Sequence, residues 1–279
     1  MKKYSRVYLE IGNICNMNCS FCHGTKRAPL QMSAENFRIA AEKLRPVTDY
    51  LYLHLMGEPL CHPELIKIIA IACELGFKCA ITTNGTLLCK LGKALLDSGV
   101  YKINISLHSF EKASSEQKSS YIRSCLSFAD AASKKGILTV LRLWNGEGNS
   151  GKNSDSTELI AEYFSSESFV FGARGYRIRN KLHVEYGEKF DWPDPSAADM
   201  GENVFCYGLS DHFGVLADGT VVPCCLDSDA NIPLGNIFSE DIEKILTSER
   251  ADAIRCGFSE HKAAEPLCRR CGYARRFKI

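Results

Sequence analysis

Short apolar strands alternate with amphipathic helices along most of the 279-residue chain, and this alternation limits the fold more than any other feature. A strand, a helix and a second strand in succession favour a parallel sheet with right-handed crossovers. The predicted strands cover residues 6–12, 50–56, 77–85, 101–109, 137–145 and 176–186. The predicted helices cover residues 33–46, 62–76, 85–99, 120–136 and 156–166. The pattern therefore predicts an α/β fold built on a parallel sheet of six strands.

The pattern changes after a proline-rich connection at residues 188–201, which we interpret as a domain boundary. We expect one domain at residues 1–190 and a second, smaller domain at residues 191–279. In the second domain, residues 212–225 have the pattern of a β-hairpin around an Asp-Gly turn. Residues 239–255 have the pattern of a single helix whose first serine is the N-cap.

The inward face of the predicted sheet carries an unusual number of polar side chains. Side chains of a strand alternate between its two faces, so the face with the apolar residues must pack against the helices. The opposite, inward set contains Glu10, Tyr52, His54, Met56, Thr82, Asn84, Asn104, Ser106, His108 and Arg142. Branched apolar residues fill the core of a compact barrel. A polar interior therefore indicates a cavity for a polar ligand at the carboxyl ends of the strands.

Three of these inward residues are candidates for catalysis or substrate binding. His54 and His108 could bind a substrate or move a proton, because histidine titrates near neutral pH. Alternatively, each histidine forms hydrogen bonds that only fix the end of a strand. Glu10 could bind a substrate or pair with a buried arginine.

Cys15, Cys19 and Cys22 follow the first predicted strand within eight residues. A structural zinc site requires four ligands, commonly supplied as pairs of cysteines two residues apart. This segment has no fourth cysteine, and the next one along the chain is Cys61. Three thiolates can bind three irons of a four-iron cluster and leave the fourth iron open. An open iron implies a ligand that is also a reactant.

This cysteine segment, with Phe21 before its third cysteine, resembles the radical S-adenosylmethionine (SAM) enzymes. Residues 56–59, Met-Gly-Glu-Pro, are similar to the family's Gly-Gly-Glu-Pro motif, which binds the amino group of SAM. Met56 replaces the first glycine in a contact that is made largely through backbone atoms. Residues 82–85 and 105–109 resemble later SAM contacts of the family. The SAM-binding residues that the resemblance implies are Phe21, Gly57, Glu58, Asn84, Ser106 and Arg142.

The resemblance implies a partial (β/α)6 barrel of the TIM type, which agrees with the six predicted strands. In such enzymes a reduced 4Fe-4S cluster, here at Cys15, Cys19 and Cys22, passes one electron to SAM. The resulting 5′-deoxyadenosyl radical removes a hydrogen atom from the substrate. The resemblance thus implies a lyase or an oxidoreductase that uses an electron donor such as flavodoxin or ferredoxin.

A second set of cysteines lies after the predicted boundary. It contains Cys206, Cys224, Cys268 and Cys271. Their spacing resembles the opening of the family's SPASM extension. Because the chain ends soon after Cys271, it resembles the shorter, α+β twitch extension, which implies one auxiliary 4Fe-4S cluster with four thiolate ligands. A structural zinc ion with the same ligands is the alternative. Cys225 could replace Cys224, since neighbouring strand residues point to opposite faces, and Cys256 is another possible substitute.

The composition argues against several classes of function. A net charge of +1 gives no global attraction to nucleic acid or to an anionic membrane surface. No apolar stretch reaches the length that a bilayer requires, and the N-terminus lacks a secretory signal. We therefore expect a cytoplasmic protein with neither a nucleic-acid partner nor a membrane partner.

A small polar molecule is the expected substrate. Peptide-modifying relatives often carry a leader-binding segment before the barrel, whereas this sequence starts directly on the first strand. With a single predicted auxiliary cluster, the chain resembles dehydrogenases that act on cyclitol-like alcohols. A second possible activity is that of a lyase that releases a deazaguanine base from queuine. Two other functions stay open. One is a maturase for a ribosomally synthesised peptide or protein, and the other is a non-enzymatic iron–sulfur or zinc sensor or scaffold.

Overall fold

A sheet of eleven strands forms the centre of the protein in the computed structural model, which describes residues 3–110, 114–144 and 153–277. Six neighbouring strands of this sheet pair in parallel, and their order across the sheet follows their order along the chain. They are β1 (Arg6–Leu9), β2 (Tyr50–Tyr52), β3 (Lys78–Thr83), β4 (Lys102–Ser106), β5 (Leu138–Leu143) and β8 (Leu182–Tyr186). This order confirms the predicted fold class. Residue 145, the last of a predicted strand, lies outside the described residues.

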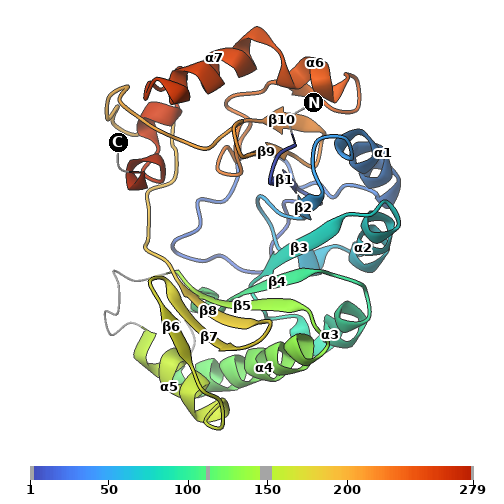
Figure 1. The fold of residues 1–279 in the computed structure, drawn as a ribbon, viewed down its shortest axis with the longest axis vertical. Coiled ribbons are helices and arrows are strands. Elements are labelled where there is room, and N and C mark those ends of the chain that lie inside the picture. The colour runs from blue at the N-terminus through green and yellow to red at the C-terminus, as the bar shows by residue number, and fades with distance from the viewer. Residues whose placement is uncertain (1–2, 111–113, 145–152, 278–279) are drawn as a thin grey trace.

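Helices cover the outer face of this curved sheet (Figure 1). The five helices that connect the parallel strands are α1 (Ala34–Leu44), α2 (Leu65–Glu74), α3 (Leu88–Leu96), α4 (Ser115–Lys134) and α5 (Ser154–Tyr163). They bury apolar side chains such as Phe37, Ile68 and Leu95 completely. The burial of each such side chain contributes about 2 kcal/mol to the stability of the folded protein. α4 begins five residues before its predicted start because Ser114 and Gln117 form a capping box.

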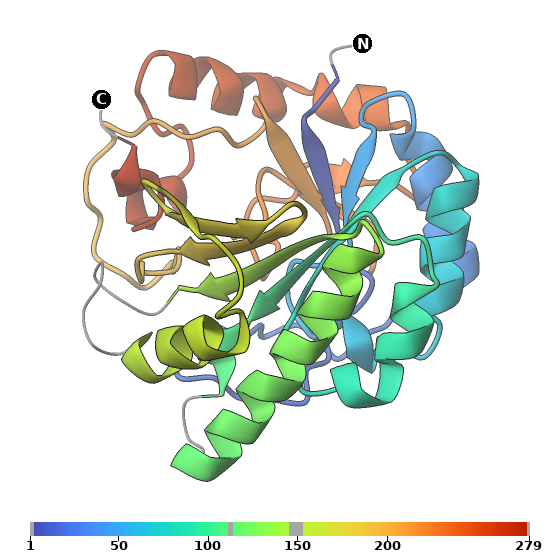
Figure 2. The same ribbon diagram turned by 60° about the horizontal axis from the view of Figure 1, so that its bottom comes forward.

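Further strands extend both edges of the parallel sheet. At one edge, β7 (Gly175–Arg179) and β6 (Val170–Gly172) follow β8. At the other edge, β9 (His212–Val215) pairs with β1 in parallel, and β10 (Thr220–Val222) and β11 (Gly235–Asn236) follow in antiparallel. Figure 2 shows these orange strands beside β1. The hairpin predicted over residues 212–225 is confirmed, with Gly219 in its turn at a φ of +87°.

The strand predicted over residues 176–186 is wrong as a single element. The structure divides this segment into β7 and β8, which pair with each other in antiparallel. Asn180 and Lys181 form the turn between them, and Lys181 adopts a left-handed φ of 66°. Only β8 joins β5 as the sixth parallel strand.

The single helix predicted over residues 239–255 is also wrong. Two helices, α6 (Ile242–Leu246) and α7 (Glu249–Ser259), occupy this segment. The side chains of Asp241 and Ser248 accept backbone hydrogen bonds at the start of α6 and of α7, respectively. The second cap ends the continuous helix, and the predicted cap, Ser239, lies outside both helices.

The predicted domain boundary between residues 190 and 191 falls between β8 and β9, in a segment without helices or named strands. Because β9 pairs with β1, the chain after the boundary continues the sheet of the barrel. The division into two domains therefore stays a prediction. Among the described residues, no helix is both long enough and apolar enough to cross a bilayer.

Replacing Ser248 by alanine should lower the free energy of unfolding by about 1 kcal/mol, because the first N–H groups of α7 lose their side-chain acceptor. Urea unfolding followed by circular dichroism measures this change. Ser239→Ala is the matched control, and its effect should stay within about 0.5 kcal/mol. Equal losses in the two variants would contradict the assignment of the cap.

Candidate active site

The three N-terminal cysteines lie on the loop that follows β1, at the carboxyl ends of the parallel strands. Cys15 and Cys22 are exposed, and Cys19 is half-buried. The thiol of Cys19 lies 3.6 Å from the carbonyl oxygen of Ser109, and that of Cys15 lies 3.9 Å from Nδ2 of Asn84. The loop therefore presents its thiols beside the segments that follow β3 and β4.

Gly57 and Glu58 hold the start of this loop in place. Gly57 has a φ of +78°, and a Cβ atom there would lie 2.5 Å from the carbonyl oxygen of Gly12, so only glycine fits. The N–H of Glu58 donates to the carbonyl oxygen of Ile14 at 2.9 Å. The buried carboxylate of Glu58 accepts a hydrogen bond from the N–H of Asn84 at 2.6 Å. These contacts join the loop to the end of β3, and direct contact of either residue with SAM stays a prediction.

A cavity of about 430 Å³ lies against the inner face of the barrel. Six of the side chains predicted to face inward line it, namely Tyr52, His54, Thr82, Ser106, His108 and Arg142. Phe21, on the cysteine loop, also lines it. The other four predicted inward residues are buried outside the lining, and these are Glu10, Met56, Asn84 and Asn104. Strand alternation thus predicts most of the barrel side of the cavity.

Glu10, a candidate for substrate binding, does not reach the cavity. It is completely buried, and each of its carboxylate oxygens lies 2.8 Å from Nη2 of Arg27. The other interpretation of Glu10, a pair with an arginine, is the one that the structure shows, and Arg27 is half-buried.

His54 faces the cavity in its uncharged form. Its Nε2 atom lies 3.0 Å from the hydroxyl oxygen of Thr82, and its buried Nδ1 atom has no hydrogen-bond partner among the described residues. Burial, together with the positive charges of Arg142 and Lys102, lowers the pKa of His54 to about 3. The imidazole is therefore neutral at pH 7, and its Nδ1 atom is enclosed by protein atoms.

His108 and Arg142 fix the end of β5 in addition to lining the cavity. Nδ1 of His108 lies 3.1 Å from the carbonyl oxygen of Arg142 and 3.3 Å from the backbone nitrogen of Trp144. The guanidinium group of Arg142 lies 4.4 Å from the ring centre of Trp144, and its Nε atom lies 3.3 Å from a carboxylate oxygen of Glu185. These contacts support the strand-fixing interpretation of His108.

Several residues of the cavity wall were not predicted from the sequence. They include Arg6, Tyr8, Trp144, Trp192, His212 and Tyr273. Nε of Arg6 donates to the hydroxyl oxygen of Tyr8 at 3.2 Å, and its guanidinium group pairs with Asp211 at 3.0 Å. Arg6 and Tyr8 are four and two residues before Glu10 on the same strand segment, so side-chain alternation places all three on the inward face. The pattern that identified Glu10 could therefore also have identified Arg6 and Tyr8. Trp192 and Tyr273 lie on irregular segments that carry no periodic signal.

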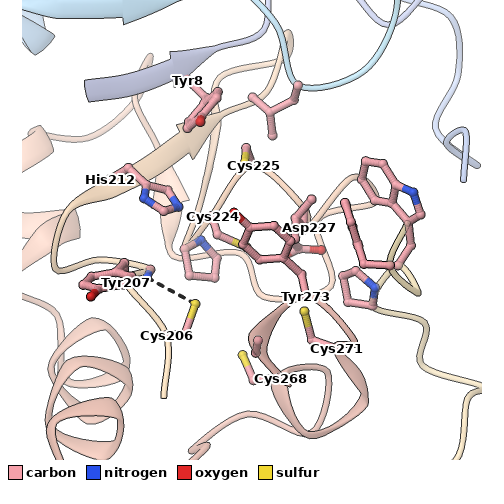
Figure 3. A pocket seen from close by; sticks show the side chains of 18 of the residues that line it. Tyr8, Cys206, Tyr207, His212, Cys224, Cys225, Asp227, Cys268, Cys271 and Tyr273 are labelled. Carbon is pink, nitrogen blue, oxygen red and sulfur yellow. Dashed lines mark hydrogen bonds between the residues drawn. The ribbon is translucent and has the colours of Figure 1, made fainter. Parts of the chain in front are cut away.

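The four C-terminal cysteines lie around another side of the same cavity (Figure 3). Burial raises the pKa of the Cys206 thiol to about 11, and burial with neighbouring thiols raises the pKa of Cys224 well above its usual range. Buried thiols suit a soft metal or an iron–sulfur cluster, which displaces their protons. The described residues contain no group of three or more cysteine, histidine or acidic side chains already arranged around one metal position. The donor chemistry nevertheless fits a cluster.

Cys224 and Cys225 point to different parts of the cavity (Figure 3). Cys224 interacts electrostatically with the three other predicted ligands, whereas Cys225 lies beside the hydroxyl group of Tyr8 and interacts with Cys206. Cys256 is exposed on α7. This arrangement favours Cys224 over the two alternative ligands.

Two family models match the chain. The model described as the radical SAM superfamily matches residues 9–157, which are more than half of the chain and include the segment with three cysteines. The chain belongs to the radical SAM superfamily. The iron–sulfur cluster-binding domain SPASM matches residues 206–272, which contain all four predicted auxiliary ligands. This radical SAM enzyme therefore uses 4Fe-4S clusters and SAM as cofactors, as predicted, and the shorter twitch form of its extension stays a prediction.

Curated relatives share only part of their length with this radical SAM enzyme. The probable GTP 3′,8-cyclase of Aeropyrum pernix is 29% identical over 135 residues, which are 44% of this chain and 38% of that protein. The probable GTP 3′,8-cyclase of Methanothermobacter thermautotrophicus is 34% identical over 105 residues, 35% of this chain and 33% of that protein. The chain thus spans about a third of the length of these relatives.

Solved structures share the fold over nearly the whole chain. BtrN in complex with AdoMet and 2-DOIA matches with a TM-score of 0.62 and 19% identity, over 97% of this chain and 94% of BtrN. AdoMet-bound anSMEcpe matches with a TM-score of 0.61 and 13% identity, over 96% and 88% of the two chains. Streptococcus suis SuiB bound to the precursor peptide SuiA matches with a TM-score of 0.56 and 15% identity, over 97% and 70%. At these identities the likeness confirms the partial-barrel fold and nothing further.

Cys224→Ala should lower the iron content of the reconstituted enzyme by about four atoms per chain, because it removes a predicted ligand of the auxiliary cluster. Cys225→Ala should keep the full iron content, since its thiol points toward Tyr8. Iron and acid-labile sulfide are measured per chain after anaerobic reconstitution, with Cys256→Ala as a surface control. Loss of iron in Cys225→Ala and retention in Cys224→Ala would reverse the assignment.

Proposed function

We propose that this radical SAM enzyme is an oxidoreductase that removes a hydrogen atom from a small polar substrate bound in the cavity. The continuity of the cavity is the observation that carries the proposal. Its lining includes Phe21 and Ser106, which the radical SAM motifs assign to SAM, and the four cysteines assigned to the auxiliary cluster. A substrate in the cavity would therefore lie between the SAM site and the auxiliary cluster.

The cavity wall suits a ligand with hydroxyl groups. The neutral imidazole of His54 lines the cavity, and Arg6 supplies guanidinium N–H donors to the wall. Aromatic rings, including those of Tyr8 and Trp192, form much of the remaining wall and exclude water. When bound, SAM with its cluster supplies a 5′-deoxyadenosyl radical, and the auxiliary cluster supplies an acceptor for the electron that leaves the substrate.

A cyclitol-like alcohol is the substrate that we favour. The similarity to BtrN, solved with AdoMet and 2-DOIA, covers nearly the whole of both chains and supports a similar architecture. Cyclisation of GTP has weaker support, because the similarity to the GTP 3′,8-cyclases covers only about a third of each protein. A lyase reaction on queuine and an electron donor of the flavodoxin or ferredoxin type stay predictions.

Modification of a peptide or protein is the second candidate. AdoMet-bound anSMEcpe with the Cp18Cys peptide, and SuiB with its precursor peptide, share the fold over 96% and 97% of this chain. One side chain of a peptide would also fit a cavity of about 430 Å³. The two candidates differ in whether a free small molecule or a peptide is consumed.

Replacing Cys15, Cys19 and Cys22 together by alanine should reduce the iron content from about eight to about four atoms per chain and abolish reductive cleavage of SAM. The remaining iron would belong to the auxiliary cluster. Iron analysis and the formation of 5′-deoxyadenosine under reducing conditions measure both effects. Cys73 and Cys89, which are exposed and lie outside both sets, provide a matched double-alanine control. SAM cleavage at the wild-type rate in the triple variant would contradict the assignment.

Incubation of the reduced enzyme with SAM and a panel of cyclitols should yield 5′-deoxyadenosine and a ketone. The ketone has two hydrogen atoms fewer than the cyclitol, because oxidation of a secondary alcohol to a ketone removes two hydrogen atoms. Mass spectrometry detects the product. A parallel incubation with short peptides tests the second candidate, and one with queuine tests the lyase reaction. If no cyclitol raises 5′-deoxyadenosine formation above the substrate-free level, the cyclitol assignment fails.

A further inference from the structure

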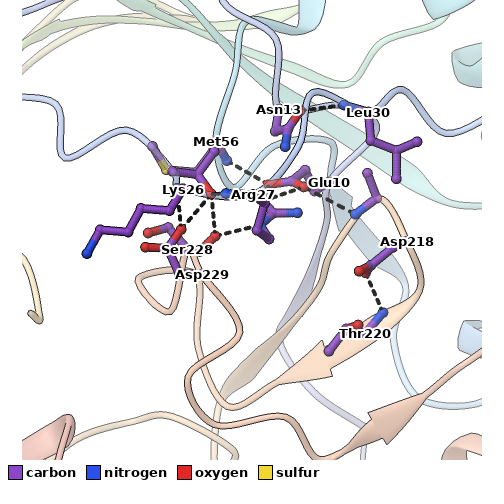
Figure 4. Close-up of polar contacts among 12 residues, drawn as sticks. Glu10, Asn13, Lys26, Arg27, Leu30, Met56, Asp218, Thr220, Ser228 and Asp229 are labelled. Carbon is purple, nitrogen blue, oxygen red and sulfur yellow. Dashed lines mark hydrogen bonds and ion pairs between the residues drawn. The ribbon is translucent and has the colours of Figure 1, made fainter. Parts of the chain in front are cut away.

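Two loops that carry predicted cluster ligands contact each other directly (Figure 4). The first is the loop after Cys22, and the second is the loop after Cys224. The hydroxyl group of Thr25 donates to a carboxylate oxygen of Asp229 at 2.6 Å, and the N–H of Lys26 donates to the same oxygen at 2.8 Å. One acidic side chain of the SPASM domain thus binds two successive residues of the N-terminal cysteine loop.

Arg27 adds the charged contact between these loops. Its Nε atom donates to the carbonyl oxygen of Ser228 at 2.7 Å, and its Nη2 atom lies 2.8 Å from both carboxylate oxygens of Glu10. The side chain of Glu10 is 0% exposed and that of Arg27 is 15% exposed. Charge-assisted hydrogen bonds are about twice as strong as neutral ones, and the low-dielectric surroundings strengthen them further.

Glu10 connects this contact to two more parts of the molecule. Its carboxylate accepts hydrogen bonds from the N–H of Met56 at 3.1 Å and from the N–H of Ala217 at 3.2 Å. Met56 precedes the glycine that holds the start of the cysteine loop, and Ala217 follows β9 in the SPASM domain. One carboxylate therefore connects the end of β1, the cysteine loop, the segment after β2 and the SPASM domain.

We propose that Glu10 and Arg27 are a positioning pair that sets the distance between the two cluster sites. The proposal rests on the proposed assignment of the two cysteine sets to iron–sulfur clusters. Arg27 lies five residues after Cys22, and Asp229 lies five residues after Cys224, so both halves of the contact are short extensions of ligand-bearing segments. A substrate that lies between the SAM site and the auxiliary site requires this distance to stay fixed.

The alternative explanation of the Glu10–Arg27 ion pair is that it only stabilises the contact between the two domains. Stability measurements do not separate the two explanations, because removal of either partner leaves an unpaired buried charge and destabilises the chain. The distance between the two paramagnetic clusters does separate them. It changes only if the pair positions the two loops.

The test compares Arg27→Met with the control Arg179→Met in the reconstituted enzyme. Arg179 is a matched control because its side chain is 20% exposed and pairs with Asp130 and Glu167, away from the cavity. With both clusters reduced, pulsed electron paramagnetic resonance measures their magnetic interaction. Arg27→Met should retain both clusters and broaden the distribution of intercluster distances, whereas Arg179→Met should give the wild-type distribution.

Hydrogen exchange adds a readout that does not depend on iron. In Arg27→Met, amide exchange should rise about tenfold or more in residues 13–31 and in residues 226–232, because both loops lose their common partner. If Arg27→Met does not fold, Thr25→Val replaces it in both measurements. This variant removes the hydroxyl contacts with Asp229 and Ser228 and the hydrogen bond that the hydroxyl oxygen accepts from the N–H of Arg27, but it leaves the Arg27 side chain in place, so smaller changes in both loops are expected.

An unchanged distance distribution in a folded Arg27→Met enzyme, or a rise in exchange confined to one loop, would overturn the proposal. Absence of iron from the wild-type enzyme would instead overturn the proposed function. The exchange of the two loops would still decide in that case whether Arg27 positions them relative to each other.

Discussion

The buried carboxylate of Glu10 is the interaction on which the arrangement of the site depends. It receives hydrogen bonds from Arg27, Met56 and Ala217, which lie on three different segments. Burial raises the pKa of the Glu10 carboxyl, and these donors oppose the rise because they favour the charged form. A buried charge that loses its partner costs about 3–5 kcal/mol. The three segments must therefore keep their positions around this one side chain.

The periodic parts of the fold are those that the sequence predicts well. The spacing of apolar residues predicts the six parallel strands and the helices between them, since strands and helices bury apolar residues at different intervals along the chain. The prediction for residues 176–186 failed because the two strands of a hairpin have the same period as one long strand, and the turn at Asn180 and Lys181 contains neither glycine nor proline. The helix over residues 239–255 failed because Ser248, an N-cap, lies inside an otherwise helical pattern.

The residues of the candidate site also fall into two groups, those that the sequence predicts and those that it does not. Strand parity alone indicates that His54 and Arg142 face inward, and both line the cavity. Trp192 and Tyr273 reach the cavity through the packing of irregular segments, which leaves no local pattern to detect. Side-chain alternation predicts that the carboxyl group of Glu10 faces inward. It does not predict which distant residue balances the charge of that group.

A polar interior requires that each buried charge has a partner, and here the partners come from different parts of the chain. Glu185, on β8, lies beside Arg142, so the barrel itself supplies that pair. Asp211 pairs with Arg6, and it belongs to the segment that the SPASM model matches. That segment also supplies the N–H of Ala217 to Glu10. The segment that the SPASM model matches therefore supplies the counter-charge of Arg6 and one of the donors to Glu10, and both parts of the chain line the cavity.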